Sequence, residues 1–136
     1  MNLAADANVL LSAIIGGRAR LALGHPQVGE IVTTADTFAE VEEYTLVLAK
    51  KKRLPPDILL LAAAALPVSV VTRNLYAKRI PDAVKLIGRR DPDDVELLAL
   101  ALHFRIAIWS NDRDFERLPV DLFTTERLLR HLGIIH

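Results

Sequence analysis

Short apolar runs alternate with helix-like segments along this chain, and that alternation limits its fold more than any other feature. Strands that alternate with helices generally pair in parallel, and the helices then cover both faces of the sheet. The predicted strands cover residues 2–7, 30–33, 68–72, 106–109 and 122–123. We therefore expect a three-layer α/β/α fold in which the central sheet is mostly parallel.

Local signals mark the expected helices. Thr34 is a suitable N-cap for a long amphipathic helix that ends in a basic turn, and Thr124 begins the last helix. Asp93 is expected to cap the helix that carries Asp94. In the preceding helix, Pro81 is either a weak point or part of the first turn of the second half. The predicted helices cover residues 10–15, 18–23, 35–51, 55–66, 76–87, 94–104 and the segment after 124. No linker or repeat divides the chain, so we expect a single domain over residues 1–136.

Charge and composition exclude several classes of protein. The 17 basic and 17 acidic residues balance, so any attraction to nucleic acid must be local. The absence of cysteine excludes disulfides, thiolate chemistry and cysteine-based zinc sites, and it is compatible with a reducing cytoplasm. The chain starts almost directly with a strand pattern, which leaves no room for a signal peptide. Its longest apolar run, residues 58–71, is too short to span a bilayer, so we expect a cytoplasmic protein.

Four acidic residues lie at the end of a strand-like run or within a helix-like one. Asp6 and Asp112 follow the first and fourth predicted strands. Asp94 lies in the first turn of its helix, and Glu40 lies farther along another. In parallel sheets the ligands bind beyond the carboxyl ends of the strands, where these side chains can meet. Clustered carboxylates repel one another unless they share protons or bind cations, and hard oxygen ligands select Mg²⁺ or Mn²⁺. We therefore expect a metal-dependent phosphodiesterase, and a nuclease in particular.

The acidic segments also resemble a known family. The sequence DANVLLSA is followed by a T-x-A-x-x-x-A-E-V element, by DDVELLALAL and by IAIWSNDRDF, in an order and spacing similar to those of PIN domains such as VapC-type toxins. The resemblance extends over residues 6–115. It implies a Rossmann-like α/β/α fold and a Mg²⁺- or Mn²⁺-dependent ribonuclease site. For the toxin branch it further implies RNA as substrate, a cognate antitoxin and a homodimer.

The resemblance assigns metal-binding and catalytic roles residue by residue. The family's first aspartate corresponds to Asp6, its helix glutamate to Glu40, its third acid to Asp94 and its late acid to Asp112. Asp6 and Asp94 would be the central ligands. Glu40 would bind metal or orient the attacking water, and Asp112 would complete the site directly or through water.

Two features leave the assignment of acids open. Asp91, Asp93 and Asp94 crowd together, so the assignment of the third ligand is open by one residue. Asp114 competes with Asp112 for the role of late ligand.

Each candidate also has a structural alternative. Asp6 is suited to cap the following helix, and Glu40 is suited to be an exposed helix acid like Glu43. Asp94 is suited to be an N1 residue that favours the helix dipole, and Asp112 is suited to be a turn residue. Asn8 either hydrogen-bonds a ligand carboxylate or forms a turn. Ser110 is a candidate to orient Asp112. A catalytically weak PIN-fold module that acts by binding a protein or RNA is the alternative function.

Basic and apolar segments outside the motifs have open roles. Arg89 and Arg90 precede the acid cluster, and Arg113 lies within the late acidic segment, so these arginines either pair with acids or receive substrate phosphates. Trp109 lies inside an apolar strand and is expected in the core. The apolar residues 58–66 form either a dimer or partner surface or a buried helix face.

Overall fold

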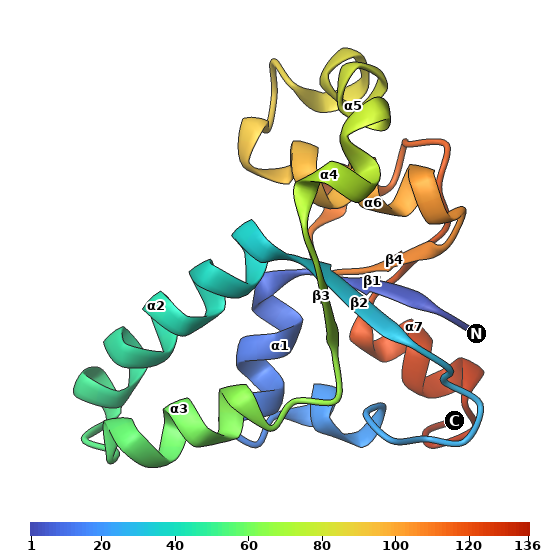
Figure 1. Cartoon of the computed structure of the whole chain (residues 1–136). Coiled ribbons are helices and arrows are strands. Elements are labelled where there is room, and N and C mark those ends of the chain that lie inside the picture. Colours follow the sequence, from blue (N-terminus) through green and yellow to red (C-terminus); the bar gives the residue numbers. More distant parts are fainter.

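A five-stranded parallel sheet forms the centre of the computed structural model, which describes residues 1–136 (Figure 1). The strand order is β3-β2-β1-β4-β5, and every neighbouring pair runs parallel. The strands are β1 (Leu3–Ala5), β2 (Ile31–Thr34), β3 (Ser69–Val71), β4 (Ala107–Trp109) and β5 (Leu122–Phe123). After β3 the chain crosses back over the sheet to place β4 on the other side of β1. The order of the strands therefore reverses between β1 and β4, which is where parallel sheets open a ligand crevice.

Helices cover both faces of the sheet, as Figure 1 shows. The α-helices are α1 (Ala7–Ile14), α2 (Ala35–Lys52), α3 (Pro56–Ala64), α4 (Arg73–Tyr76), α5 (Ile80–Ile87), α6 (Val95–Phe104) and α7 (Thr125–His131). The 3₁₀ turns are η1 (Arg18–Leu21), η2 (Ala77–Arg79), η3 (Pro92–Asp94) and η4 (Arg113–Phe115). This arrangement confirms the predicted three-layer α/β/α, PIN-like fold.

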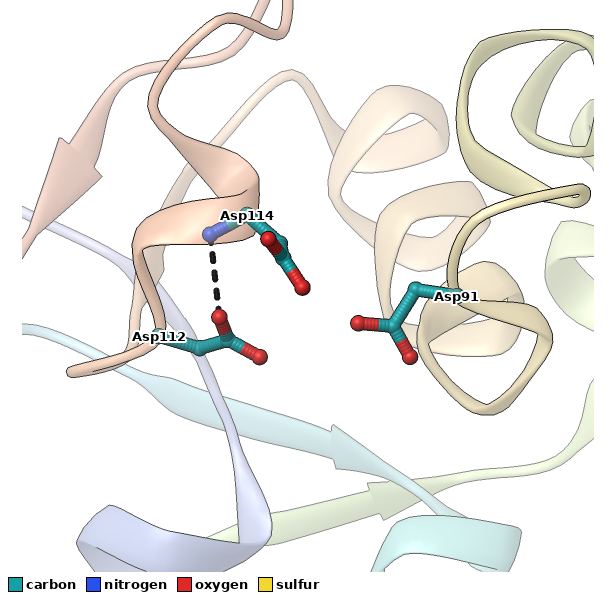
Figure 2. A group of neighbouring side chains, drawn as sticks. All are labelled: Asp91, Asp112 and Asp114. Atoms are coloured by element: carbon teal, nitrogen blue, oxygen red, sulfur yellow. Dashed lines mark hydrogen bonds between the residues drawn. The ribbon is translucent and has the colours of Figure 1, made fainter.

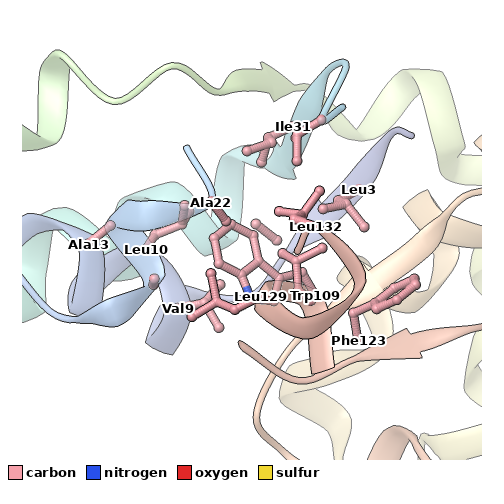
Figure 3. Close-up of a cluster of buried hydrophobic side chains, with 14 of the residues drawn as sticks. Leu3, Val9, Leu10, Ala13, Ala22, Ile31, Trp109, Phe123, Leu129 and Leu132 are labelled. Carbon is pink, nitrogen blue, oxygen red and sulfur yellow. The ribbon is translucent and has the colours of Figure 1, made fainter. Parts of the chain in front are cut away.

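Two hydrophobic clusters lie on opposite faces of the sheet. Alternate residues of β1 enter different clusters: Leu3 and Ala5 join the cluster that includes α1 and α7, whereas Ala4 joins the one that includes α6. Such burial on both faces explains why the strands read as continuous apolar runs. Trp109 is fully buried in the first cluster, as predicted, and its indole Nε1 donates a hydrogen bond to Thr125 Oγ1 at 3.1 Å (Figure 3).

Side-chain caps start two of the helices at the predicted places. Thr34 Oγ1 accepts a hydrogen bond from the backbone N–H of Thr37 at 2.9 Å, which begins α2 directly after β2. Thr124 Oγ1 does the same for the N–H of Arg127 at 3.1 Å at the start of α7. These caps satisfy N–H groups that the first turn of a helix leaves without a partner. The strand β2 therefore ends at the threonine that caps α2, and β5 ends one residue before the threonine that caps α7.

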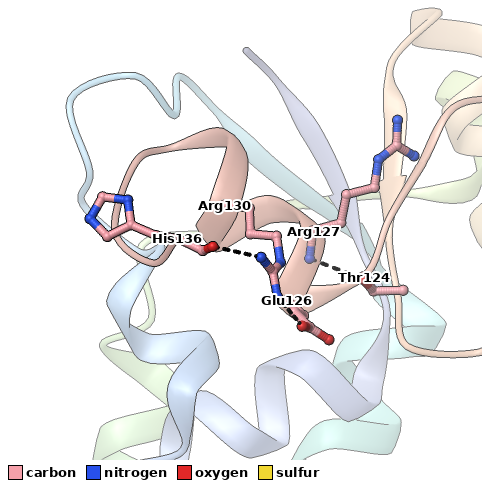
Figure 4. Close-up of polar contacts among 5 residues, drawn as sticks. All are labelled: Thr124, Glu126, Arg127, Arg130 and His136. Carbon is pink, nitrogen blue, oxygen red and sulfur yellow. Dashed lines mark hydrogen bonds and ion pairs between the residues drawn. The ribbon is translucent and has the colours of Figure 1, made fainter.

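The short helix α7 is also held along its exposed side and at its end (Figure 4). Glu126 and Arg130, one turn apart, form an ion pair at 2.8 Å. The other guanidinium nitrogen of Arg130 donates a hydrogen bond to the carbonyl oxygen of His136 at 2.9 Å. The C-terminal residues are thereby tied to the helix that packs under β1 and β4.

The segment predicted to be helical over 76–87 contains the end of α4, η2 and α5, and Pro81 lies in the first turn of its second half, as one of the two alternatives predicted. Two local predictions were wrong. Asp93 does not cap α6, because Pro92 opens a 3₁₀ turn and Asp94 takes the cap position without a side-chain hydrogen bond. The segment after Gly17 forms a 3₁₀ turn instead of an α-helix.

The helices α2 and α3 form a pair that projects from the sheet (Figure 1). Part of α3 is a buried face that includes Leu59 and Ala63. Its opposite face exposes 62% of Ile58 and 70% of Leu61, and Tyr44 and Val47 are exposed on α2. The apolar segment 58–66 therefore buries one helix face and exposes apolar side chains on the other. None of the helices has both the length and the apolar character that a bilayer crossing requires.

Candidate metal centre

An acidic cavity of about 180 Å³ lies at the carboxyl ends of β1 and β4. The two strands are paired through Ala5 and Trp109, and the N–H of Asp6 donates to the carbonyl oxygen of Trp109 at 3.0 Å. The residues that follow each strand therefore meet at one edge of the sheet. All four predicted acids line the cavity together with two more aspartates: Asp6, Glu40, Asp91, Asp93, Asp94 and Asp112.

Asp6 is fixed by two hydrogen bonds. Its Oδ1 accepts from the N–H of Ala7 at 2.7 Å, and its Oδ2 accepts from the hydroxyl of Ser110 at 2.7 Å. Asp6 is the N-cap residue of α1, so the capping role and a position in the cavity are both realised. Because each of its two oxygens accepts a hydrogen bond, the carboxylate has little freedom to rotate away from the cavity.

Ser110 connects the first acid to the last one. Its buried hydroxyl donates to Asp6 and accepts a hydrogen bond from the backbone N–H of Asp112 at 3.0 Å. The sequence suggested Ser110 as a residue that orients Asp112. Its donated hydrogen bond instead goes to Asp6, which is 104 positions earlier in the chain.

Asp112 lies at the start of the turn after β4. Its Oδ1 accepts a hydrogen bond from the N–H of Asp114 at 2.9 Å, which holds the turn closed. Figure 2 shows Asp91, on the loop after α5, facing Asp112 and Asp114 across a gap. One carboxylate oxygen from each of these three residues lies within 4.8 Å of the other two. Asp114 therefore lies beside Asp112, whereas only Asp112 of the two lines the cavity itself.

Glu40 and Asn8 complete the wall of the cavity. Glu40 lies on α2, and Asn8 lies in the first turn of α1. Glu43, one turn farther along α2, opens into an adjacent groove of about 380 Å³ that also contains Glu40. Glu40 therefore lines both the cavity and the groove, whereas Glu43 lines only the groove.

Three carboxyl groups of the cavity have raised pKa values. Burial, followed by hydrogen bonding to Asp91 and the charge of Asp6, raises the pKa of Asp94 to about 8. Burial also raises the pKa of Asp6, although the hydrogen bonds from Ser110 and Ala7 lower it in part. The pKa of Glu40 is raised by burial and then by the charges of Asp6 and Asp93. Acids whose pKa is raised by burial and by neighbouring negative charges lack a balancing positive charge nearby.

The family model of the PIN domain matches residues 5–133. The chain belongs to the PIN domain family. Proteins of this family are generally nucleases that use divalent metals. The resemblance inferred from the four acidic segments is therefore confirmed at the level of the family.

Solved structures with the same fold include two toxin–antitoxin assemblies. A toxin–antitoxin complex from Klebsiella pneumoniae is similar with a TM-score of 0.66 and 21% identity, covering 90% of this chain and 97% of that chain. VapBC2 from Rickettsia felis, bound to a DNA fragment from its promoter, is similar with a TM-score of 0.69 and 14% identity, covering 91% of this chain and 98% of that one. No curated protein sequence matches this PIN domain. At these identities the structures show a shared fold alone.

The donor set of the PIN domain fits a divalent cation. The cavity is lined by six carboxylates and by no lysine or arginine. Carboxylate oxygens are hard ligands of the kind that Mg²⁺ and Mn²⁺ prefer, and the raised pKa values indicate negative charge without a counter-ion. The same residues would be a poor site for a soft metal, since the chain has no cysteine and no histidine lines the cavity.

Asp91 is the residue whose position was least apparent from the sequence. It was visible there only as part of the crowded DPDD segment. Its place beside Asp112 and Asp114 depends on how the loop after α5 packs against the turn after β4. The available signal was the spacing of Asp91 and Asp94, three residues apart, just before an apolar helix.

Proposed function

We propose that this PIN domain is a Mg²⁺- or Mn²⁺-dependent endoribonuclease and the toxin of a type II toxin–antitoxin pair. The observation that carries the proposal is the convergence of acids from four separate segments on one cavity at the reversal point of the sheet. Raised pKa values in that cavity support it, because such acids gain most from a bound cation.

In this proposal Asp6, Glu40, Asp94 and Asp112 are the metal-binding and catalytic residues. Divalent ions, when bound, lower the pKa of water and offset the negative charge of a phosphodiester. Asp6 and Asp94 are the central ligands, and Ser110 keeps the Asp6 carboxylate in place through the hydrogen bond to Oδ2. Glu40 binds metal or orients the attacking water, and Asp112 completes the site directly or through water.

The proposed reaction needs no nucleophile from the protein. Direct attack of water on phosphorus breaks the bond to the 3′ oxygen of the preceding nucleotide. The products are then a 5′-phosphate and a 3′-hydroxyl. Because the net charge of the chain is zero, any attraction to the RNA phosphates must come from local groups of basic residues.

We further propose an antitoxin protein and a second copy of this chain as partners. Both similar structures described above are toxin–antitoxin assemblies, which supports a partner of that kind. The exposed apolar side chains of α2 and α3, among them Ile58 and Leu61, offer surface that a protein partner would cover. A cytoplasmic location accords with RNA as the substrate. Light scattering tests the homodimer, since a monomer has a mass of 15.0 kDa.

Metal removal and return test the nuclease directly. Purified protein is treated with EDTA, divided, and incubated with single-stranded RNA in buffer or in Mn²⁺. We expect cleavage only after Mn²⁺ is added, with fragments that carry 5′-phosphates. Cleavage that continues in EDTA, or fragments with 5′-hydroxyls, would contradict the proposed chemistry. A protein that stays intact and binds RNA without cutting it would favour the binding-module alternative.

A further inference from the structure

Arg90 joins the two loops that carry the late acids. Its guanidinium Nη2 donates a hydrogen bond to the backbone carbonyl oxygen of Asp114 at 2.7 Å, across 24 positions of sequence. The sequence left two roles for Arg90, pairing with an acid side chain or receiving a substrate phosphate. The structure gives its guanidinium a backbone acceptor next to the acids.

We propose that Arg90 is a positioning residue that holds Asp91 beside Asp112 and Asp114 and thereby sets the spacing of these carboxylates for a divalent cation. This inference rests on the proposed function, because it assumes that the acidic cavity binds metal. It adds a residue that none of the acidic motifs contains.

One end of this connection is anchored on the helix α5. The backbone N–H groups of Arg90 and Asp91 both donate to the carbonyl oxygen of Ile87, at 3.1 and 2.8 Å. Ile87 is buried in the hydrophobic cluster beneath α5 and α6. Arg90 and Asp91 are therefore fixed to the same turn, so a tether on the arginine also restrains the aspartate.

The other end is anchored on the turn after β4. Asp114 is held by the hydrogen bond from its N–H to Asp112 Oδ1, and the next residue, Phe115, is fully buried in the same cluster as Ile87. The carbonyl that accepts from Arg90 thus belongs to a turn with little freedom. Packing of Ile87 and Phe115 brings the two loops near each other, and the hydrogen bond fixes their remaining separation.

Electrostatics explains why a tether is needed. Three carboxylates within 4.8 Å of one another repel, and in the absence of a cation this repulsion pushes the Asp91 loop away from the turn. No other hydrogen bond between side chains or backbone joins these two loops. Arg90 supplies a hydrogen-bond donor that links its own loop to the backbone of the turn beside these carboxylates. Loss of Arg90 should therefore widen the gap and weaken cation binding without unfolding the core.

The test compares Arg90→Ala and Arg90→Lys with wild type, with Lys85→Ala as the matched control. Lys85 is exposed on α5, and its removal changes the net charge by the same amount. Mn²⁺ affinity is measured by calorimetry, and the melting temperature is measured in EDTA. Arg90→Ala should bind Mn²⁺ roughly tenfold more weakly, as expected when a supporting residue of a metal site is removed. Its melting temperature in EDTA should equal that of wild type, and Arg90→Lys should recover part of the affinity.

RNA cleavage provides the second measurement. At saturating Mn²⁺ the Arg90→Ala variant should regain most of the wild-type rate, with an unchanged KM for RNA. Unchanged Mn²⁺ affinity in Arg90→Ala would overturn the inference. So would a raised KM for RNA at saturating Mn²⁺, which indicates phosphate binding, or an equal fall in melting temperature with and without metal, which indicates a general folding role. Wild-type protein that binds no Mn²⁺ would instead refute the proposed function together with this inference.

Discussion

Replacement of Asp94 by asparagine should stabilise the metal-free protein and abolish its response to metal. The carboxyl group of Asp94 has a pKa of about 8 in the fold, against an ordinary value of 3.8. In the range between these two values the unfolded chain releases the proton and the folded chain keeps it. The free energy of unfolding of metal-free wild type therefore falls as pH rises from about 4 to about 8, and then levels off. Asparagine imitates the protonated acid and does not titrate.

The size of the effect follows from the burial of Asp94. A shift from 3.8 to about 8 would correspond to about 6 kcal/mol for a fully buried group. Asp94 is only half-buried, and solvent screening reduces the expected difference to about 1–2 kcal/mol. At pH 8.5 in EDTA the Asp94→Asn variant should therefore melt about 3–8 °C above wild type. At pH 5.5 the difference in melting temperature should be smaller, because the raised pKa of Asp94 has cost the wild type less stability at that pH.

Thermal melts followed by circular dichroism at both pH values, with EDTA or Mn²⁺, test this reasoning. Mn²⁺ should raise the melting temperature of wild type and leave Asp94→Asn unchanged. The control is Asp57→Asn, an exposed acid at the start of α3 that is remote from the cavity. It should respond to Mn²⁺ like wild type. An Asp94→Asn variant that is no more stable than wild type at pH 8.5, or that gains equally from Mn²⁺, would refute the account.

Two further predictions concern the metal and its support. Mn²⁺ at about a hundred times its Kd should stabilise wild type by about 2.7 kcal/mol through mass action, and equal melting temperatures in EDTA and in millimolar Mn²⁺ would count against a formed site. Ser110→Ala removes the donor to Asp6 and the acceptor for the Asp112 N–H in a buried location. It should cost about 1–3 kcal/mol in urea unfolding and raise the pKa of Asp6 further, whereas unfolding identical to wild type would mean that these hydrogen bonds contribute nothing.

The main features of the fold were predictable because they depend on local and repeated signals. The strands β2 and β3 come from short β-branched runs that lie next to predicted helices. The caps Thr34 and Thr124 lie within three residues of the N–H groups that they bind, so a short stretch of sequence is enough to recognise them. The start of α6 was not predictable in the same way. Pro92 and the acids after it favour both a cap and a 3₁₀ turn, and the structure contains the turn.

The details of the candidate site depend on contacts between distant segments. Asp6 and Asp112 were predictable because parallel strands deliver their carboxyl ends to one edge. The hydrogen bond from Ser110 to Asp6 requires that β1 and β4 be neighbours, which the chain order does not reveal. The approach of Asp91 to Asp114 depends on the packing of Ile87 and Phe115 in one cluster. No pattern within a short window encodes such a contact.

The rate of RNA cleavage by Asp6→Asn is the most direct test of the central claim that the acidic cavity is the nuclease site. Asparagine keeps the size of Asp6; its oxygen can accept the hydrogen bond from the Ala7 N–H, and its NH₂ group can donate to the Ser110 hydroxyl, so the fold should survive. Wild type, Asp6→Asn and the Asp57→Asn control are compared on single-stranded RNA in Mn²⁺. We predict that Asp57→Asn cuts like wild type and that Asp6→Asn is slower by several orders of magnitude, because several kcal/mol of metal-dependent stabilisation are lost. Equal activity in wild type and folded Asp6→Asn would contradict the claim.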